Sequence, residues 1–297
     1  MQSERCWICS ITTLIKINQR CRIIFACCPM KLLFSEQKSD YDNYQFPYVI
    51  WAIPEAGETP ADIFNAGFLP SSRQLDRFYL CRQVRVSLAQ FMPSSENRRI
   101  LRKGAGIEGK LMTRAQFDYT PARRVFMKTY ADIKYGKDTM SFERLDALLA
   151  SPLISHLLVF TDGEKGNEVG VAMMYLEGKT LAYYYYAFYD LNYYARNLGM
   201  FMMTTAVALF AGIGCQQLYL GTCYSDTARY KTQFAGAEFF NGFRWSDDME
   251  ELKFIIRRDQ GKERQHLLET EAYRASFYQE GGFARIAEWS GFLLKTN

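Results

Sequence analysis

The fold is decided by residues 181–240, LAYYYYAFYDLNYYARNLGMFMMTTAVALFAGIGCQQLYLGTCYSDTARYKTQFAGAEFF. The first nine residues are all apolar or aromatic, which is short for a helix and typical of a buried strand. Apolar residues then run from 199 to 212, and Gly212 and Gly214 end a helix that must be buried on most sides. A second strand is expected over 216–221 and a second helix over 225–233. Ligands of such a unit bind where strands end and helices begin.

The flanking segments extend this unit into a larger sheet. Strands are expected over residues 156–160 and 168–176, with glycine-containing turns, as an antiparallel meander that leads into 181–189. Further strands are expected over 46–53, 78–88, 111–119, 239–245 and 252–257. Helices are expected from 120 to about 135 and from 140 to 150, with Thr120 and Ser141 as caps, and over 262–297. The predicted fold class is α/β (α+β), with a mixed, largely antiparallel sheet and flanking helices.

Four regions are predicted along the 297 residues. Residues 1–29 are expected to be a disordered or spurious extension, and 30–150 an N-terminal region with a basic patch. Residues 151–260 would form the catalytic domain and 261–297 a helical segment. A hydrophobic share of 48% with 23% charged residues is typical of soluble proteins. No run approaches the roughly 18 apolar residues of a membrane span.

The eight cysteines divide into an N-terminal group of five and three scattered ones, Cys81, Cys215 and Cys223. The scattered cysteines have no paired spacing, which favours a reduced, cytosolic protein. A four-thiolate site formed by Cys6, Cys9, Cys27 and Cys28 is a weaker alternative, because adjacent cysteines strain tetrahedral ligation. We therefore predict no metal and no cofactor.

Positive charge is concentrated in one segment, although the net charge is only +4. Nine basic residues stand against Glu108 and Asp118 between residues 98 and 128: Arg98, Arg99, Arg102, Lys103, Lys110, Arg114, Arg123, Arg124 and Lys128. Such a patch can bind a polyanion through phosphate contacts. The alternative is a solvated face of two helices.

The order of meander, central helix, strand and helix resembles the GNAT acyltransferase fold. In members that use acetyl-CoA, the turn before the central helix resembles Arg/Gln-x-x-Gly-x-Gly/Ala, whose small residues let the backbone approach a pyrophosphate. Here the turn is Arg196-Asn197-Leu198-Gly199-Met200-Phe201. Phe201 replaces the last small residue, which argues against an ordinary CoA site.

Several motifs narrow the resemblance to the aminoacyl-tRNA protein transferases, which add an amino acid to protein N-termini. The segments Tyr189-Asp190-Leu191-Asn192 and Arg196-Asn197-Leu198-Gly199 are similar to that family's YDPD and RSLG motifs. Tyr219-Leu220-Gly221 and Tyr230-Lys231-x-x-Phe234 resemble its YLG and YKxxF motifs. Residues 81–86 and 91–99 resemble its CVPVRV and FxPSRSQRR motifs. The family's cysteines that precede Cys81 are missing here, so we expect no iron–sulfur cluster.

The resemblance implies an enzyme that transfers an amino acid from aminoacyl-tRNA to an amine of a protein or peptide. Its partners would be aminoacyl-tRNA and the acceptor, with no membrane. Asp190, Tyr224 and Tyr230 are the candidate catalytic residues: Asp190 would bind or deprotonate the amine, and Tyr224 or Tyr230 would protonate the leaving ribose oxygen. The candidate substrate-binding residues are Arg196, Leu198, Gly199, Tyr219, Gly221 and Lys231. The candidate tRNA-binding residues are Arg85, Arg98, Arg99, Arg102 and Lys103.

Each assignment has a structural alternative. Asp190 would instead cap a helix, the tyrosines would pack or bond locally, and Lys231 and Arg196 would form surface ion pairs. Backbone N–H groups of residues 171–175 are expected to stabilise the oxyanion if that strand splays from its neighbour. Tyr183 to Tyr186 would pack in the core or stack on the terminal adenine of tRNA. An acyl-CoA-dependent GNAT enzyme and a non-catalytic RNA- or protein-binding member remain the alternative functions.

Overall fold

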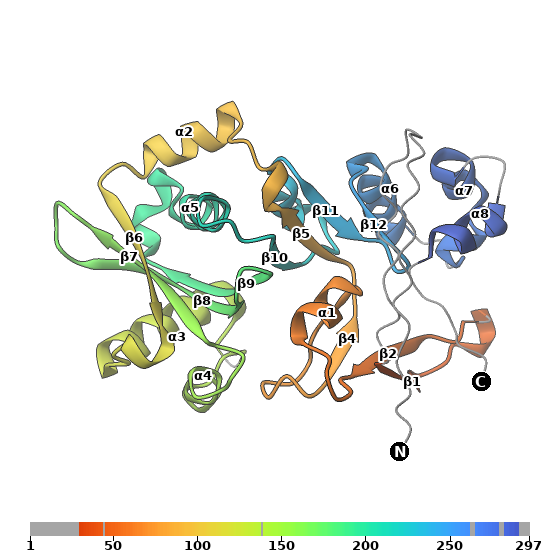
Figure 1. Cartoon of the computed structure of the whole chain (residues 1–297), viewed down its shortest axis with the longest axis horizontal. Coiled ribbons are helices and arrows are strands. Elements are labelled where there is room, and N and C mark those ends of the chain that lie inside the picture. The colour runs from red at the N-terminus through yellow and green to blue at the C-terminus, as the bar shows by residue number, and fades with distance from the viewer. Residues whose placement is uncertain (1–29, 44, 138, 262–264, 279–281, 291–297) are drawn as a thin grey trace, which may run out of the picture.

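The computed structural model describes residues 30–290 apart from 44, 138, 262–264 and 279–281. A large sheet runs through the molecule in the order β12-β11-β5-β10-β9-β8-β7-β6 (Figure 1). Within the described residues, β9 and β10 form its one parallel pair. The strands are β5 (Gln83–Ser87), β6 (Ile107–Thr113), β7 (His156–Asp162), β8 (Glu168–Glu177), β9 (Leu181–Tyr189), β10 (Gln217–Thr222), β11 (Ala237–Phe240) and β12 (Trp245–Ser246). The predicted mixed, largely antiparallel sheet is confirmed.

Helix α5 (Leu198–Gly212) connects the two parallel strands, as the apolar run predicts. Gly214 ends it with φ of +76°, a conformation that glycine adopts without steric cost. The helix packs on one face of the sheet beside α2 (Ser95–Lys103), which Ser94 caps by accepting from the N–H of Asn97. Eight α5 side chains are buried, and burying one large apolar side chain contributes about 1.5–3 kcal/mol. Sequence hydrophobicity therefore accounts for the place of α5.

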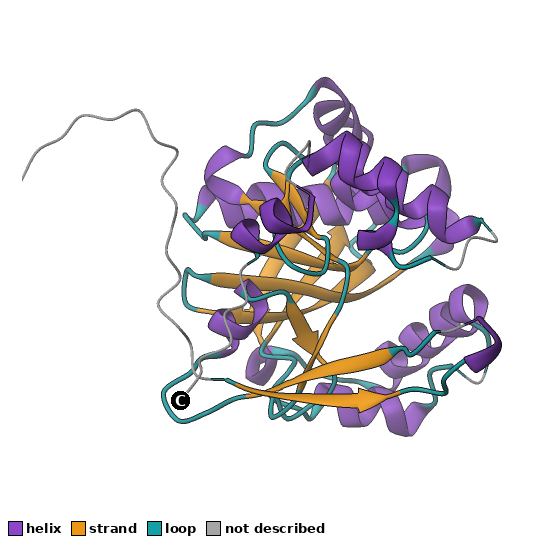
Figure 2. Ribbon diagram, turned by 90° about the vertical axis from the view of Figure 1, so that its right-hand side faces the viewer, coloured by secondary structure: helices purple, strands orange, loops and turns teal. Residues whose placement is uncertain are grey.

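The opposite face of the sheet is covered by α1 (Pro60–Asn65), α3 (Pro121–Tyr135) and α4 (Phe142–Leu149). Thr120 and Ser141 cap α3 and α4 as predicted, each accepting from a backbone N–H three residues on. Figure 2 shows helices on both sides of the strands. The sheet thus separates a first core around α5 from a second core beneath α1, α3 and α4.

A second, four-stranded antiparallel sheet has the order β1-β2-β4-β3. Its strands are β1 (Lys31–Glu36), β2 (Tyr48–Ile53), β3 (Phe68–Pro70) and β4 (Phe78–Leu80). The single strand predicted over 78–88 is therefore wrong, because β4 pairs with β2 and β3 whereas β5 pairs with β10 and β11. The chain passes from one sheet to the other at Cys81 and Arg82. Apolar alternation continues across this crossing, so it gives no signal of the change of partner.

The C-terminal part is helical, with α6 (Met249–Gln260), α7 (Glu271–Tyr278) and α8 (Gly282–Trp289). The strand predicted over 252–257 is wrong. Asp248 caps α6 by accepting from the N–H groups of Glu250 and Glu251, and its buried Leu252, Ile255 and Ile256 follow helical spacing. The helix predicted over 225–233 is the 3-10 segment η5 (Asp226–Thr232). The one or two helices predicted over 262–297 are present, in the described part of that range, as α7 and α8.

Strands from separate predicted regions share the large sheet. Both β5 and β6 lie in residues 30–150, yet they pair with strands of residues 151–260. The division at residue 150 stays a prediction. No helix in the described part of the chain is long and apolar enough to cross a membrane.

Candidate active site

The parallel strands β9 and β10 separate after three pairs, the last being Tyr183 with Tyr219. Each carries an extra residue just beyond this point, Tyr185 in the β9 pairing with β8 and Leu220 in the β10 pairing with β5. Such bulges bend a strand and increase its twist. The two strands therefore splay, and α5 begins beside the opening.

A cavity of about 590 Å³ lies at this opening. Its walls come from β9, the start of α5, η5 and the end of β10, together with α3 from the other side of the sheet. Seven of the fifteen lining residues are tyrosines, and no acidic residue is among them. The lining residues are Tyr130, Tyr135, Tyr184, Tyr185, Tyr186, Ala187, Tyr189, Asn197, Leu198, Gly199, Met200, Met203, Leu220, Tyr230 and Lys231.

The start of α5 forms one wall, and Tyr189 covers it. Asn197 has a left-handed conformation there, with φ of +56°. A Cβ atom on Gly199 would lie 2.8 Å from the Tyr189 ring, so any other residue would displace that ring. Phe201 points away from the cavity, into the core against Phe160 and Gly104. Phe201 therefore does not cover the helix start, where Tyr189 lies instead, so the replacement at position 201 gives no steric argument against CoA.

Two predicted residues on η5 enter the cavity, Tyr230 and Lys231. The Lys231 ammonium donates to the carbonyl oxygen of Thr222 at 2.7 Å. Burial lowers the pKa of Lys231, and no carboxylate of the described residues is paired with it. Burial raises the pKa of the Tyr230 phenol, which therefore stays protonated at neutral pH. The cavity thus holds one cation and a set of neutral hydroxyl groups.

Of the remaining predicted residues, Leu198 and Gly199 line the cavity, whereas Asp190, Arg196 and Tyr224 are not part of its lining. Asp190 accepts from the backbone and side-chain amides of Asn192, as a cap of the 3-10 segment η4 (Leu191–Arg196). These hydrogen bonds match the helix-cap alternative for Asp190, and its catalytic role stays a prediction. Arg196 and Tyr224 also form hydrogen bonds with neighbouring segments.

Arg196 joins the start of α5 to the end of α2. Its guanidinium donates to the carbonyl oxygens of Lys103 and Ala105 and lies 3.6 Å from the Asp162 carboxylate. The Tyr224 hydroxyl accepts from the Arg82 N–H at 2.9 Å. Both side chains thus hold neighbouring segments together.

Tyr219 and Arg85 lie on the opposite face of the sheet, which corrects their predicted roles. Tyr219 is 2% exposed and packs edge-on against Phe64. Arg85 is 7% exposed, pairs with Glu238 at 2.7 Å and stacks on Trp245 at 3.8 Å. A guanidinium that is buried, paired with Glu238 and stacked on Trp245 is not available to a phosphate. The motif spacing could not show this, because alternate residues of one strand face opposite sides of the sheet.

Gly221 follows the bulge of β10 with φ of +81°. A Cβ atom there would lie 3.7 Å from the Lys231 ammonium, so Gly221 borders the cation. The predicted substrate-binding set thus divides: Leu198, Gly199 and Lys231 line the cavity, and Gly221 adjoins it.

The prediction of which strand splays and supplies oxyanion donors is also corrected. Residues 171–175 belong to β8, which is paired along both edges with β7 and β9. The strand that splays is β9, from Tyr184 onward. Among the described residues, its edge toward β10 has no strand partner there, so backbone donors for an oxyanion would come from β9.

Some basic residues of the patch are paired with carboxylates and others are not. Arg123 pairs with Glu168, Arg124 with Asp146 and Lys128 with Asp132. On α2, Arg99 pairs with Glu96, whereas Arg98, Arg102 and Lys103 are exposed and have no carboxylate partner in the described residues. Lys110 and Arg114 also have no carboxylate partner in the described residues. Three of the five uncompensated charges of the patch therefore lie on α2. Its C-terminal end reaches Arg196, the residue before the cavity-lining Asn197.

No group of three or more potential metal ligands is present in the described ranges. Cys81, Cys215 and Cys223 are buried free thiols, and burial raises the pKa of Cys81 to about 12. The cysteines at positions 6, 9, 27 and 28 lie outside the described residues.

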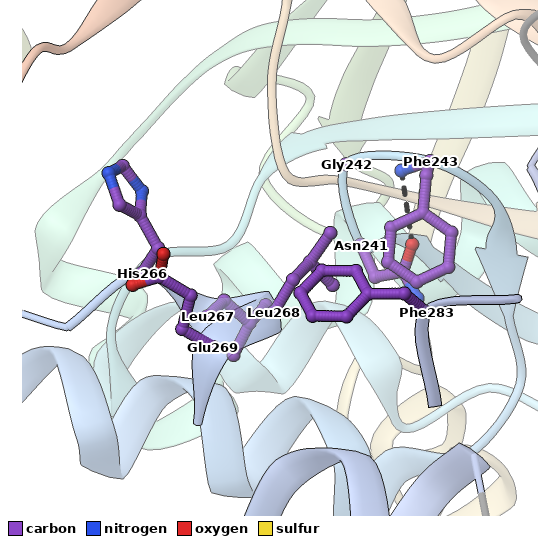
Figure 3. Close-up of a pocket in the computed structure, with 8 residues that line it drawn as sticks. All are labelled: Asn241, Gly242, Phe243, His266, Leu267, Leu268, Glu269 and Phe283. Carbon is purple, nitrogen blue, oxygen red and sulfur yellow. Dashed lines mark hydrogen bonds between the residues drawn. The ribbon is translucent and has the colours of Figure 1, made fainter. Parts of the chain in front are cut away.

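A second cavity, of about 490 Å³, lies between the turn after β11 and the C-terminal helices (Figure 3). Its lining includes His266, the 3-10 segment η6 (Leu267–Glu269) and Phe283 of α8. Asn241 accepts from the N–H of Phe243 at its edge. None of the predicted site residues lies in it.

No protein-family model matches the chain. Two solved structures overlap with it loosely. The L-PGS of Bacillus licheniformis gives a TM-score of 0.37 at 15% identity, over 48% of this chain and 46% of that one. A GCN5-related N-acetyltransferase of Sphaerobacter thermophilus gives 0.31 at 12% identity, over 54% and 45%. These overlaps are too loose to add to the assignment.

Curated relatives are more informative, and those that follow are named aspartate/glutamate leucyltransferase. The Ruegeria pomeroyi protein is 24% identical over 172 residues, 56% of this chain and 61% of its own length. The Chromobacterium violaceum protein is 25% identical over 57% of this chain and 70% of its own length. The Gluconacetobacter diazotrophicus protein is 27% identical, over 56% and 64%. The chain thus spans about 61% of the Ruegeria relative. The resemblance carried by the motifs is confirmed: over the matched part of its length, this chain is a distant relative of the aminoacyl-tRNA protein transferases named aspartate/glutamate leucyltransferase.

Proposed function

We propose that this protein transfers an amino acid from aminoacyl-tRNA to an amine of a protein or peptide. The observation that carries the proposal is that residues from two separate motifs meet in one cavity. Leu198 and Gly199 come from one motif of the transferase resemblance and Tyr230 and Lys231 from another, and all four line one cavity where β9 and β10 splay. Charged tRNA is used in the cytoplasm, so the proposal places the protein there.

The reaction makes modest demands on side chains, because an aminoacyl ester is already activated. The amine nitrogen attacks the ester carbonyl, a C–N bond forms and the bond to the ribose oxygen breaks. The attacking nitrogen releases one proton to water and the ribose oxygen gains one, and the acid that supplies the second proton regains it from water, so the reaction is balanced. We assign this second transfer to Tyr230, because its protonated phenol lines the cavity. Asp190, Arg196 and Tyr224 stabilise the surrounding segments and are given no step in the reaction.

Lys231 supports an acidic acceptor. It is the one basic residue in the cavity lining, and the lining holds no acidic residue that would compete for it. The relatives' name, aspartate/glutamate leucyltransferase, points to the same chemistry. We propose that the Lys231 ammonium binds the side-chain carboxylate of an N-terminal Asp or Glu, with leucine as the transferred residue. Hydrogen bonds between charged groups are about twice as strong as neutral ones.

Replacing Lys231 by methionine is expected to abolish the preference for an acidic acceptor. The wild type should favour a peptide with N-terminal Asp over the matched Asn peptide by about tenfold in kcat/KM, as expected for one charged hydrogen bond. Because burial lowers the pKa of Lys231, this preference should fall as pH rises through that pKa, below the pH at which an ordinary lysine deprotonates. The variant should show equal rates for both peptides at every pH. An undiminished Asp preference in the variant would place acceptor recognition elsewhere.

The exposed charge of α2 supports a role in binding the tRNA backbone. Joint replacement of Arg98, Arg102 and Lys103 by alanine should weaken tRNA binding and reduce the slope of log K against log salt by about 0.7–0.9 for each lost phosphate contact. At saturating tRNA, kcat should be unchanged. The control replaces Lys31 and Lys179, which are exposed and lie outside α2. Equal salt slopes for the triple variant and the wild type would exclude this surface.

The proposal is tested by incubating the purified chain with tRNA charged with labelled leucine and peptides that begin with Asp, Glu, Asn or Ala. Parallel reactions contain labelled acetyl-CoA. Label should appear on the Asp and Glu peptides, at the α-amine, and only with charged tRNA. Transfer from acetyl-CoA alone would replace the proposal by a CoA-dependent acyltransferase. Binding of tRNA without transfer would favour a binding protein.

A further inference from the structure

Tyr184 is a buried residue of the cavity to which no motif points. It lies on β9, one position past the last pair with β10, and its side chain faces α5. The residue is 5% exposed, and its hydroxyl oxygen has no hydrogen-bond partner among the described residues. An unpartnered buried hydroxyl is destabilising, whereas phenylalanine would fill the same space without this cost. The presence of a hydroxyl at this position therefore indicates that it binds a ligand.

The surroundings of Tyr184 identify the kind of ligand atom. Other phenols, those of Tyr189 and Tyr230, and the thioether of Met203 surround the same space. Burial raises the pKa of Tyr184 well above its ordinary value, so the hydroxyl remains a proton donor. A neutral donor in a cavity without carboxylates suits an oxygen that gains negative charge.

The position of Tyr184 also fits the reacting group. It stands where β9 leaves β10 and before the bulge at Tyr185, so it borders the gap between the strands. Tyr230, the proposed proton donor, lines the same cavity. Tyr184 and Tyr230 thus border the same cavity, where the proposed function places the reacting group.

We propose that the Tyr184 hydroxyl donates a hydrogen bond to the carbonyl oxygen of the donor ester. This inference rests on the proposed function. When the amine attacks, the C=O electron pair moves onto that oxygen, and the bond from Tyr184 strengthens with the charge. When the ribose oxygen leaves, the pair returns and the carbonyl re-forms. Tyr184 keeps its proton throughout, and the leaving oxygen takes its proton from Tyr230.

The test compares Tyr184→Phe with Tyr183→Phe. Tyr183 is equally exposed, at 5%, but packs on the opposite face of the sheet against Phe64. Transfer of labelled leucine from charged tRNA to an Asp peptide is followed together with the thermal unfolding midpoint. Tyr184→Phe should lower kcat by about 100-fold, as expected for loss of one oxyanion donor. Its unfolding midpoint should be unchanged or higher. Tyr183→Phe should retain kcat within about twofold, since it loses no oxyanion donor.

The outcomes separate this inference from the proposed function. An active wild type with an equally active Tyr184→Phe variant would overturn the inference and leave the function standing. A lower unfolding midpoint that accounts for the lost activity would assign Tyr184 a structural role and also overturn it. A wild type that transfers from acetyl-CoA instead would refute the tRNA proposal, and the same two variants would then be compared with that donor. A wild type inactive with both donors would overturn both.

Discussion

Replacing Tyr230 by phenylalanine is expected to reduce kcat for aminoacyl transfer by about 100-fold, the contribution of a positioned general acid. The ribose oxygen leaves as a strong base unless it gains a proton, and Tyr230 is the phenol of the η5 motif that lines the cavity. Burial raises the pKa of this phenol and keeps it protonated over the neutral range. KM should change little, because the hydroxyl matters mainly in the transition state.

Tyr224→Phe is the matched comparison for this prediction. Tyr224 precedes Tyr230 by six residues and was an equal candidate by sequence, but its hydroxyl accepts from the Arg82 N–H outside the cavity. Single-turnover measurements with excess enzyme isolate the chemical step, and Tyr224→Phe should stay within about threefold of the wild type, the cost of one neutral hydrogen bond. A larger loss in Tyr224→Phe than in Tyr230→Phe would reverse the assignment of the acid.

Replacing Glu251 by alanine is expected to lower the free energy of unfolding by about 3–5 kcal/mol, typical of breaking a buried charged network. Glu251 is fully buried on α6. Its carboxylate accepts from five side chains of β12, α7 and the turn between β11 and β12: Asn241, Arg244, Ser246, Tyr273 and Tyr278. Removing it leaves the Arg244 charge and two buried phenols without their acceptor. Chemical denaturation measures the change.

The neighbouring Glu250 gives the control for Glu251. It is exposed, and its one ion pair among the described residues is with Lys253, three residues along the helix. Such pairs contribute less than about 1 kcal/mol, so Glu250→Ala should have little effect on unfolding. Similar losses for the two variants would show that the buried network contributes no more than a surface pair.

Local patterns predicted the elements well where the signal lies within one segment. The strand over 181–189 matches β9, the helix over 199–212 matches α5 to within one residue, and the caps Thr120 and Ser141 are present. Predictions failed where the pattern was ambiguous. The short apolar run at 252–257 fits both the two-residue period of a strand and the 3.6-residue period of a helix. The N-cap at Asp248 shows that it is a helix.

The sequence by itself determined the central strand–helix–strand unit and the family resemblance, because hydrophobic periodicity and short motifs are properties of neighbouring residues. It also selected Leu198, Gly199, Tyr230 and Lys231. Tertiary structure decided which candidates meet. Bulges open the strands, α3 brings Tyr130 and Tyr135 to the same cavity, and the pleat turns Arg85 and Tyr219 to the opposite face. These outcomes depend on strand pairing and packing between distant segments, which no local spacing encodes.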